Sequence, residues 1–241
     1  MPRLALMIDL ERCTGCKSCE AACKSEHALG PTERHNRVVW LGSKLEENSN
    51  NNQALDFLAL ACQHCERPAC VRACPVSPKA ISKNKETGVV TVNEDACVGC
   101  GECVTACPYG AMGFDPDGRH AVKCDLCSDR RAEGATTTAC AAVCPTKAIT
   151  FGERDELLKT TETNNREMIK NDPFLLGPAT IYLDRVTNKQ KKFDAADRNS
   201  PKVIDSFTNI SINDTVFPYG HNREDREITR IETGGCNICF N

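Results

Sequence analysis

The chain has 241 residues, of which 18 are cysteine, and its formal net charge is −3 with neutral histidines. Aromatic residues make up only 5% of the chain, so the hydrophobic core is expected to be thin and bound metal must help to organise the fold. The dispersed basic residues exclude a nucleic-acid-binding face, because no basic stripe is interleaved with aromatic residues.

The first ten residues contain a short apolar run that leads directly to Cys13. This run predicts a buried strand, because no charged leader, long apolar core or cleavage site marks an export signal. Dense cysteine in a secreted chain would indicate disulfides. Here cysteines two residues apart recur throughout and are poorly placed to bridge each other, which favours metal binding. Since no apolar stretch could span a membrane, we expect a cytoplasmic protein or one peripheral to the inner membrane.

Sixteen of the cysteines form four quartets, which in chain order are Cys13-Cys16-Cys19-Cys23, Cys62-Cys65-Cys70-Cys74, Cys97-Cys100-Cys103-Cys107 and Cys124-Cys127-Cys140-Cys144. The first and third have the spacing of the bacterial ferredoxin run, and the other two keep both ends of it with a longer middle gap. Proline follows the last cysteine of every quartet except the first, where Lys24 stands instead.

This spacing is typical of ligands for [4Fe–4S] clusters, in which three cysteines reach one cluster and the fourth reaches the cluster of a partner quartet. We expect the fourth cysteine to begin a helix, because the proline after it suits a first helical turn. No quartet lacks a cysteine, which disfavours a [3Fe–4S] cluster. Four complete quartets also disfavour zinc, although a single Cys-x2-Cys pair would fit that metal.

The second and third quartets are close in sequence and joined by a predicted hairpin, so we pair them and leave the first to pair with the fourth. The expected groups are cluster A (Cys13, Cys16, Cys19, Cys144), cluster B (Cys124, Cys127, Cys140, Cys23), cluster C (Cys62, Cys65, Cys70, Cys107) and cluster D (Cys97, Cys100, Cys103, Cys74). The segments between the quartets predict a loop at 46–52, a strand at 55–60, hairpins of 80–82 with 89–92 and 112–114 with 121–122, and a strand at 179–183.

The predicted fold class is therefore α+β: two ferredoxin-like units of short strands and helices, one inserted in the other and organised by the clusters, with an extended C-terminal arm. The outer unit takes residues 1–30 and 117–155, a connecting loop and strand take 31–55, the inner unit takes 56–116, and the arm takes 156–241. The polar composition of the arm predicts that it wraps a partner rather than folding as a domain.

Several residues near the quartets have alternative interpretations. Cys236 and Cys239 form an isolated Cys-x2-Cys pair, which is either a ligand pair completed by another chain, a redox-active dithiol, or two terminal thiols with no fixed role. His64 is expected to contact the cluster environment or a neighbouring chain. Three basic residues beside the fourth quartet either offset cluster charge or form a solvated face; they are Lys123, Arg130 and Arg131. No nucleophile–base pair or phosphate-binding glycine loop indicates a catalytic site.

Three stretches carry a resemblance to a known family: Cys62-Gln63-His64-Cys65-Glu66-Arg67-Pro68-Ala69-Cys70, Cys97-Val98-Gly99-Cys100 with Ala106-Cys107-Pro108-Tyr109-Gly110-Ala111, and Lys123-Cys124-Asp125-Leu126-Cys127. Over residues 4–152 the chain resembles the four-cluster electron-transfer subunits of the dimethyl sulfoxide reductase family. The resemblance extends to all sixteen ligand positions and their order. Cys100 stands where respiratory nitrate reductase subunits carry tryptophan.

The resemblance implies a large catalytic partner that holds molybdenum or tungsten in a bis-pterin guanine dinucleotide cofactor. It also implies electron exchange with a membrane quinone-reactive subunit or a soluble acceptor, and co-export on a partner's signal would place the chain in the periplasm. The alternative from another class is a free-standing polyferredoxin that meets several enzymes transiently. The long polar segment favours the bound subunit, because a diffusing carrier gains little from it.

Overall fold

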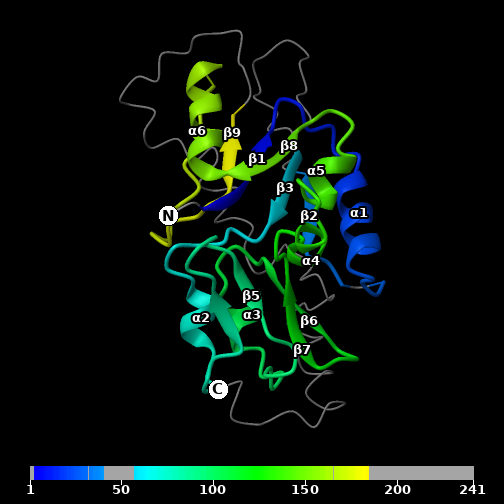
Figure 1. Ribbon diagram of the computed structural model, residues 1–241, viewed down its shortest axis with the longest axis vertical. Helices are drawn as coiled ribbons and strands as arrows, with labels where there is room; N and C mark the ends of the chain where they lie inside the picture. Colours follow the sequence, from blue (N-terminus) through cyan, green and yellow to red (C-terminus); the bar gives the residue numbers. More distant parts are fainter. Residues whose placement is uncertain (1–2, 32, 41–56, 165, 185–241) are drawn as a thin grey trace, which may run out of the picture.

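The computed structural model describes residues 3–31, 33–40, 57–164 and 166–184, which form small helices and strands (Figure 1). In chain order the elements are β1 (Leu4–Asp9), α1 (Ser18–Glu26), β2 (Asn36–Trp40), β3 (Phe57–Ala61), α2 (Ala69–Ala73), β4 (Ile81–Lys83), β5 (Val90–Val92), α3 (Glu102–Ala106), β6 (Met112–Asp115), β7 (His120–Lys123), α4 (Ser128–Ala132), α5 (Ala139–Val143), β8 (Ile149–Glu153), α6 (Arg154–Thr163) and β9 (Ile181–Leu183). The α+β class expected from the sequence is confirmed.

The strands form one three-stranded sheet and three two-stranded ones. In the larger sheet β1 is central, antiparallel to β8 and parallel to β9. The pairs β2–β3, β4–β5 and β6–β7 are antiparallel. Figure 1 shows the larger sheet with α6 at one end of the molecule and the β6–β7 hairpin with α2 and α3 at the other. Both predicted hairpins and the N-terminal strand are confirmed.

The helices that carry the cysteines have two lengths. Helices α2, α3 and α5 have five residues each, and the cysteine after each of them is extended, with ψ between 107° and 119°. Proline follows each of these cysteines, and a residue before proline is disfavoured in helical conformation. Helix α1 has nine residues and runs through Cys23, because Lys24 can continue it. The expectation that the fourth cysteine begins a helix is therefore wrong: the proline ends a helix that begins one turn earlier.

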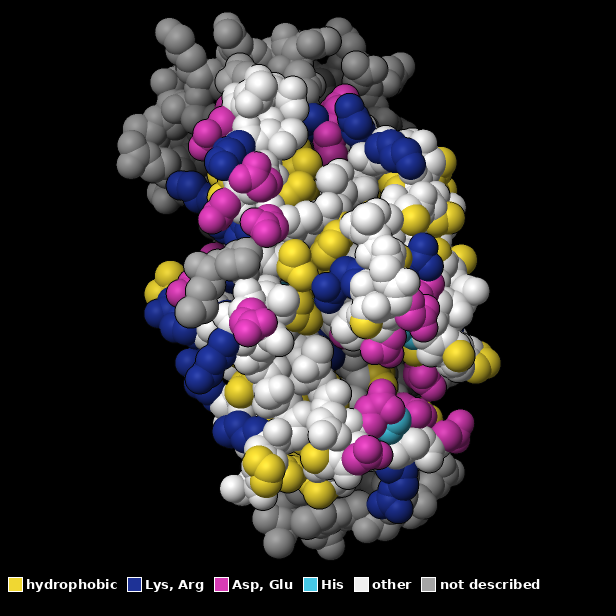
Figure 2. All heavy atoms as spheres, in the orientation of Figure 1, with side chains coloured by type: hydrophobic (Ala, Val, Ile, Leu, Met, Phe, Trp, Pro, Cys, Tyr) yellow, Lys and Arg dark blue, Asp and Glu magenta, His cyan; other side chains and the backbone are white. Residues whose placement is uncertain are grey.

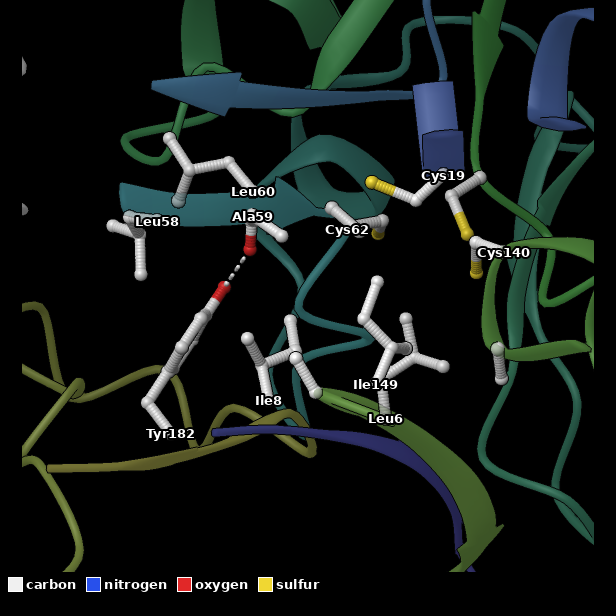
Figure 3. Packing of buried hydrophobic residues seen from close by; sticks show 14 of the residues in the cluster. Leu6, Ile8, Cys19, Leu58, Ala59, Leu60, Cys62, Cys140, Ile149 and Tyr182 are labelled. Carbon is white, nitrogen blue, oxygen red and sulfur yellow. Dashed lines mark hydrogen bonds between the residues drawn. The ribbon is translucent and has the colours of Figure 1, made fainter. Parts of the chain in front are cut away.

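The main hydrophobic cluster joins the larger sheet to β3. Leu6, Ile8 and Ile149 from the sheet pack with Leu58 and Leu60, and Cys19, Cys62 and Cys140 belong to the same cluster (Figure 3). Tyr182 is fully buried, and its hydroxyl donates to the carbonyl of Ala59 at 3.4 Å. These three thiols therefore lie inside the apolar core.

The segment predicted as an extended arm differs from expectation over the residues that the structure describes. Residues 156–184 contain most of α6 and all of β9, and β9 pairs with β1. Arg166 makes a bidentate ion pair with Asp9 at 2.7 and 2.8 Å. The segment folds onto the body because several of its apolar residues are buried, among them Leu157, Ile169 and Leu176. Residues 185–241, with Cys236 and Cys239, lie outside the described part.

Among the described residues, no helix is both long enough and apolar enough to cross a membrane. The loop predicted at residues 46–52 also lies outside the described residues, as do the first two residues of the strand predicted at 55–60. The described part of that strand is β3 (Phe57–Ala61).

Candidate metal centres

The sixteen cysteines that the structure describes are thiols, and disulfides join none of them. Among these sixteen, Cys16 alone is exposed. In each quartet the third cysteine lies in a helix. The first two lie in the loop directly before that helix, except in the fourth quartet, where they lie before α4 and the third lies in α5. The two-residue and three-residue spacings thus place four thiols on one loop and one helical turn.

The ligand loops curl back through left-handed backbone conformations. His64 has a φ of 43°, Leu126 and Cys127 have φ of 59° and 52°, and Gly99 has a φ of 71°. Glycine is required at position 99 for a second reason, because a Cβ there would lie 2.4 Å from the carbonyl oxygen of Arg119. These turns direct amide N–H groups inward.

Several of those N–H groups donate to cysteine sulfur. Leu126 donates to Cys124 Sγ at 3.4 Å, Ala148 donates to Cys144 Sγ at 3.2 Å, and His64 donates to Cys62 Sγ at 3.5 Å. Hydrogen bonds to a charged acceptor stabilise it, so these N–H groups favour the thiolate over the thiol. The same donors orient the sulfurs as metal ligands.

One cavity is lined by four thiols from two quartets. It spans about 340 Å³, part of which is open to solvent, and is lined by Cys62, Cys65, Cys70 and Cys107, with Tyr109 and Leu176 among its other walls. Burial, and to a lesser extent the neighbouring thiols of Cys62 and Cys107, raises the pKa of Cys65 and of Cys70 to about 12. Four thiolates this close repel each other, so they can ionise together only around a cation. The donor set fits an iron–sulfur cluster.

The first and fourth quartets meet where α1 packs against α5. Burial raises the pKa of Cys23, and the charges of Cys140 and Cys127 raise it further. Burial likewise raises the pKa of Cys19 to about 12, with contributions from Cys140 and Cys13. Cys124 is surrounded in the same way, because burial raises its pKa and Cys23 and Cys140 add to the effect.

The four thiols expected to bind cluster D differ in their surroundings. Burial raises the pKa of Cys103 to about 12, and Cys97 and Cys100 act in the same direction. Cys74 behaves differently: burial raises its pKa, but the N–H groups of Val76, Ile81 and Ala80 outweigh that effect and lower it. Apart from burial, the influences on the pKa of Cys74 therefore come mainly from backbone amides and not from other thiols.

The basic residues near the fourth quartet differ in burial. Lys123 is only 4% exposed, and its Nζ donates to the carbonyl oxygens of Val90 and Cys124. Arg130 pairs with Glu26 at 3.0 Å, and Arg131 donates to the carbonyl of Leu126 at 2.9 Å. The interpretation as a solvated face fails for Lys123.

His64 is buried, with 1% exposure, and its Nδ1 accepts a hydrogen bond from the N–H of Val90 at 3.0 Å. That bond assigns the proton to Nε2, which is buried without a partner among the described residues. A buried N–H without an acceptor is costly, so this atom fits a site whose acceptor is a bound cluster.

Two other histidines, which show no ligand spacing in the sequence, lie close to the fourth quartet. His27 Nε2 lies 3.6 Å from Cys127 Sγ, and its ring centroid lies 4.9 Å from that of His35. The signal that could have identified His27 is its position four residues after Cys23, one turn further along at the C-terminal cap of α1. His35 comes from a distant segment and carries no such signal.

Comparisons with known proteins agree with this chemistry. Residues 53–154 match the model of the 4Fe-4S dicluster domain, and residues 4–25 match that of a 4Fe-4S binding domain. The B subunit of the anaerobic dimethyl sulfoxide reductase of Escherichia coli (strain K12) is 42% identical over 156 residues, which are 63% of this chain and 74% of that protein.

Two further relatives are named for reductases of sulfur compounds. The thiosulfate reductase electron transfer subunit PhsB of Salmonella typhi is 32% identical over 78% of this chain and 95% of its own length. The B subunit of the polysulfide reductase of Wolinella succinogenes is 34% identical over 64% of this chain and 78% of its own length. The protein therefore belongs to the iron–sulfur B subunits of the dimethyl sulfoxide reductase family, binds four [4Fe–4S] clusters, and is a non-catalytic electron-transfer subunit.

Proposed function

We propose that the sixteen cysteines bind the four clusters in the groups A to D defined above. The group of cluster C has the most direct support, because its four cysteines line one cavity. Cluster B is supported by the electrostatic coupling of Cys23 with Cys127 and Cys140. Clusters A and D rest on their first three cysteines and on the reciprocity of the ferredoxin pattern, in which the fourth cysteine crosses to the partner cluster.

Packing between the elements supports the order A, B, C, D along the molecule. Helix α1, with Cys19 of group A, packs against α5, with Cys140 of group B, and α2, with Cys70 of group C, packs against α3, with Cys103 of group D. Cys124 of group B and Cys62 of group C belong to one hydrophobic cluster. Each cluster, when bound, supplies one-electron redox chemistry. The protein's own residues hold the clusters in line, exclude water from the middle of the path and leave the two ends accessible.

The A end and the D end of the proposed cluster path expose different residues to solvent. At the A end the loop carries Cys16, the exposed cysteine among those described. At the D end the loop between Cys97 and Cys100 carries Val98, which is 67% exposed. Figure 2 shows acidic side chains gathered over the end of the β6–β7 hairpin. This hairpin contacts the loop, since the N–H of Ala121 in β7 donates to Cys97 Sγ. These ends are the places where other redox centres can approach.

We also propose that two ferredoxin-like units are nested, with residues 56–116 inserted between 1–30 and 117–155. The packing of α1 against α5 and the pairing of β1 with β8 support an outer unit made from both ends of that range. The pairing of β9 with β1 associates residues up to 184 with the outer unit.

The proposed partner is a large catalytic chain with molybdenum or tungsten in a bis-pterin guanine dinucleotide cofactor. Electrons pass between it and a membrane quinone-reactive subunit or a soluble acceptor. The observation that carries this proposal is the complete set of four quartets in a chain whose relatives are named as subunits of reductases. The same names argue against a free-standing polyferredoxin. The location of this subunit, at the cytoplasmic face of the membrane or in the periplasm, is set by the location of that partner.

Anaerobic purification of the native assembly tests the partner. We expect molybdenum or tungsten on a large co-purifying chain, whereas a subunit that purifies alone, with iron and neither metal, would favour the free carrier. Cys144→Ser tests the crossing of the ligands. It should perturb cluster A, and damage to the cluster of Cys124, Cys127 and Cys140 with cluster A intact would refute the grouping.

A further inference from the structure

The starting observation is one buried peptide in the middle of the molecule. Val90 in β5 is 1% exposed, and both of its backbone polar groups are bonded to side chains outside the β4–β5 hairpin. Its N–H donates to His64 Nδ1, and its carbonyl accepts from Lys123 Nζ. His64 belongs to the loop of the second quartet, and Lys123 directly precedes the fourth. This peptide therefore connects the loops of two quartets.

The ammonium group of Lys123 is buried without a carboxylate partner among the described residues. Its two hydrogen-bond acceptors, the carbonyl oxygens of Val90 and Cys124, are neutral. A lysine ammonium has three donors, so one of them is not used by these carbonyls. Burying a charge without an opposite charge is costly. The cost is offset if the missing negative charge is supplied by the clusters, which are anionic with their thiolates.

Lys123 lies near thiols of two different groups. Its Nζ donates to the carbonyl oxygens of Cys124 and Val90. Val90 in turn lines the cavity that Cys70 also lines. Cys70 belongs to group C and Cys124 to group B, which are the two inner groups of the proposed path. One fixed charge can thus act on both inner clusters at once.

We propose that Lys123 is a shared buried counter-charge of the two inner clusters, which makes both easier to reduce, and that His64 positions it through the Val90 peptide. The inference rests on the proposed ligand groups. A positive charge favours the reduced form of a cluster, because reduction adds an electron nearby. The effect is strong only where solvent is excluded, as it is around Lys123. Lys123 is thus a positioning and tuning residue for the electron path.

The test compares three variants in the purified native complex, with midpoint potentials from redox titration followed by electron paramagnetic resonance. Lys123→Gln removes the charge and keeps a donor, and Lys123→Arg keeps the charge. Lys79→Gln is the matched control, because Lys79 is exposed and its Nζ also donates to the carbonyl of a ligand, Cys74, at 2.7 Å. Signals of the inner clusters are identified by their change in Cys70→Ser and Cys124→Ser.

In Lys123→Gln we expect the reduced-to-oxidised ratio of both inner clusters at a fixed potential to fall on the order of tenfold, about 59 mV for a one-electron couple. The outer clusters should change less. Lys123→Arg should keep the wild-type ratios, and Lys79→Gln should change its cluster by less than about threefold, because solvent screens it. Unchanged inner clusters in Lys123→Gln, or an equal fall in all four, would overturn the inference.

Loss of iron is also informative. If Lys123→Gln loses iron and Lys123→Arg does not, the charge is needed for the clusters to assemble, which supports the counter-charge. If both lose iron, the shape of lysine is required and the inference fails. A wild-type complex with fewer than four clusters would instead reject the proposed function, whatever the variants do.

Discussion

Two adjacent leucines provide the sharpest test of the role of residues 166–184. Leu176 is 7% exposed and lines the cavity of the group C cysteines, whereas Leu175 is 72% exposed. Truncating a buried leucine to alanine costs about 2 to 5 kcal/mol, and truncating an exposed one changes stability by less than about 0.5 kcal/mol. Leu176→Ala should therefore destabilise the protein strongly, and Leu175→Ala is its matched control.

The effect is best measured as a rate, because unfolding with loss of a cluster is irreversible. The loss of cluster absorbance and the release of iron are followed in urea without oxygen. Since 1.36 kcal/mol is tenfold in rate, we expect Leu176→Ala to release iron at least about tenfold faster than the wild type, with Leu175→Ala close to it. The cluster held by Cys62, Cys65, Cys70 and Cys107 should be lost first. Equal rates for the two variants would refute the packing of this segment over the cavity.

Three further predictions concern other parts of the protein. Lys24→Pro should end α1 at Cys23, as proline does after α2, α3 and α5, and should cost about 3 kcal/mol of stability. The midpoint of thermal cluster loss measures this cost. The control Lys24→Ala keeps the helical N–H and should cost much less. Arg166→Ala leaves Asp9 buried without its bidentate partner and should cost about 3 kcal/mol of stability. The exposed side chain of Arg12 lies 3.7 Å from the same carboxylate, so Arg12→Ala should cost under about 1 kcal/mol. A similar loss of thermal stability in both variants would contradict the geometry. Burial raises the pKa of Cys19 and Cys103 to about 12, so these thiols are protonated in the cluster-free protein and lose their protons when iron binds. Iron uptake by the cluster-free protein should therefore rise with pH between about 7 and 9. Uptake that does not depend on pH would count against ligation by these thiols.

The ligands and hairpins were predictable because their signals are local. Cysteine spacing identifies a cluster loop, and a turn between two runs of β-branched residues identifies the β4–β5 hairpin. The helix positions were wrong for a local reason too. Proline after a cysteine fits both the first turn of a helix and the residue beyond its end, and the extended conformation of Cys74, Cys107 and Cys144 selects the second.

The remaining features depend on contacts between distant residues. Residues 156–184 are polar on average, and only the fold reveals that Leu176 and Tyr182 fit the gap beside β3. Lys123 is charged and precedes a ligand, which fits a solvated face as well as a buried site. Its burial depends on Val90, more than thirty residues earlier. The contact of His27 with Cys127 likewise joins two quartets that are far apart in sequence.

The central claim is that this subunit carries four [4Fe–4S] clusters as an electron path. The most direct measurement is the iron and acid-labile sulfide content of the anaerobically purified protein, together with a redox titration of its clusters. Four bound clusters should give about sixteen iron and sixteen sulfide per chain and four one-electron midpoint potentials. Zinc in place of iron, or iron and potentials that fit fewer than four clusters, would contradict it.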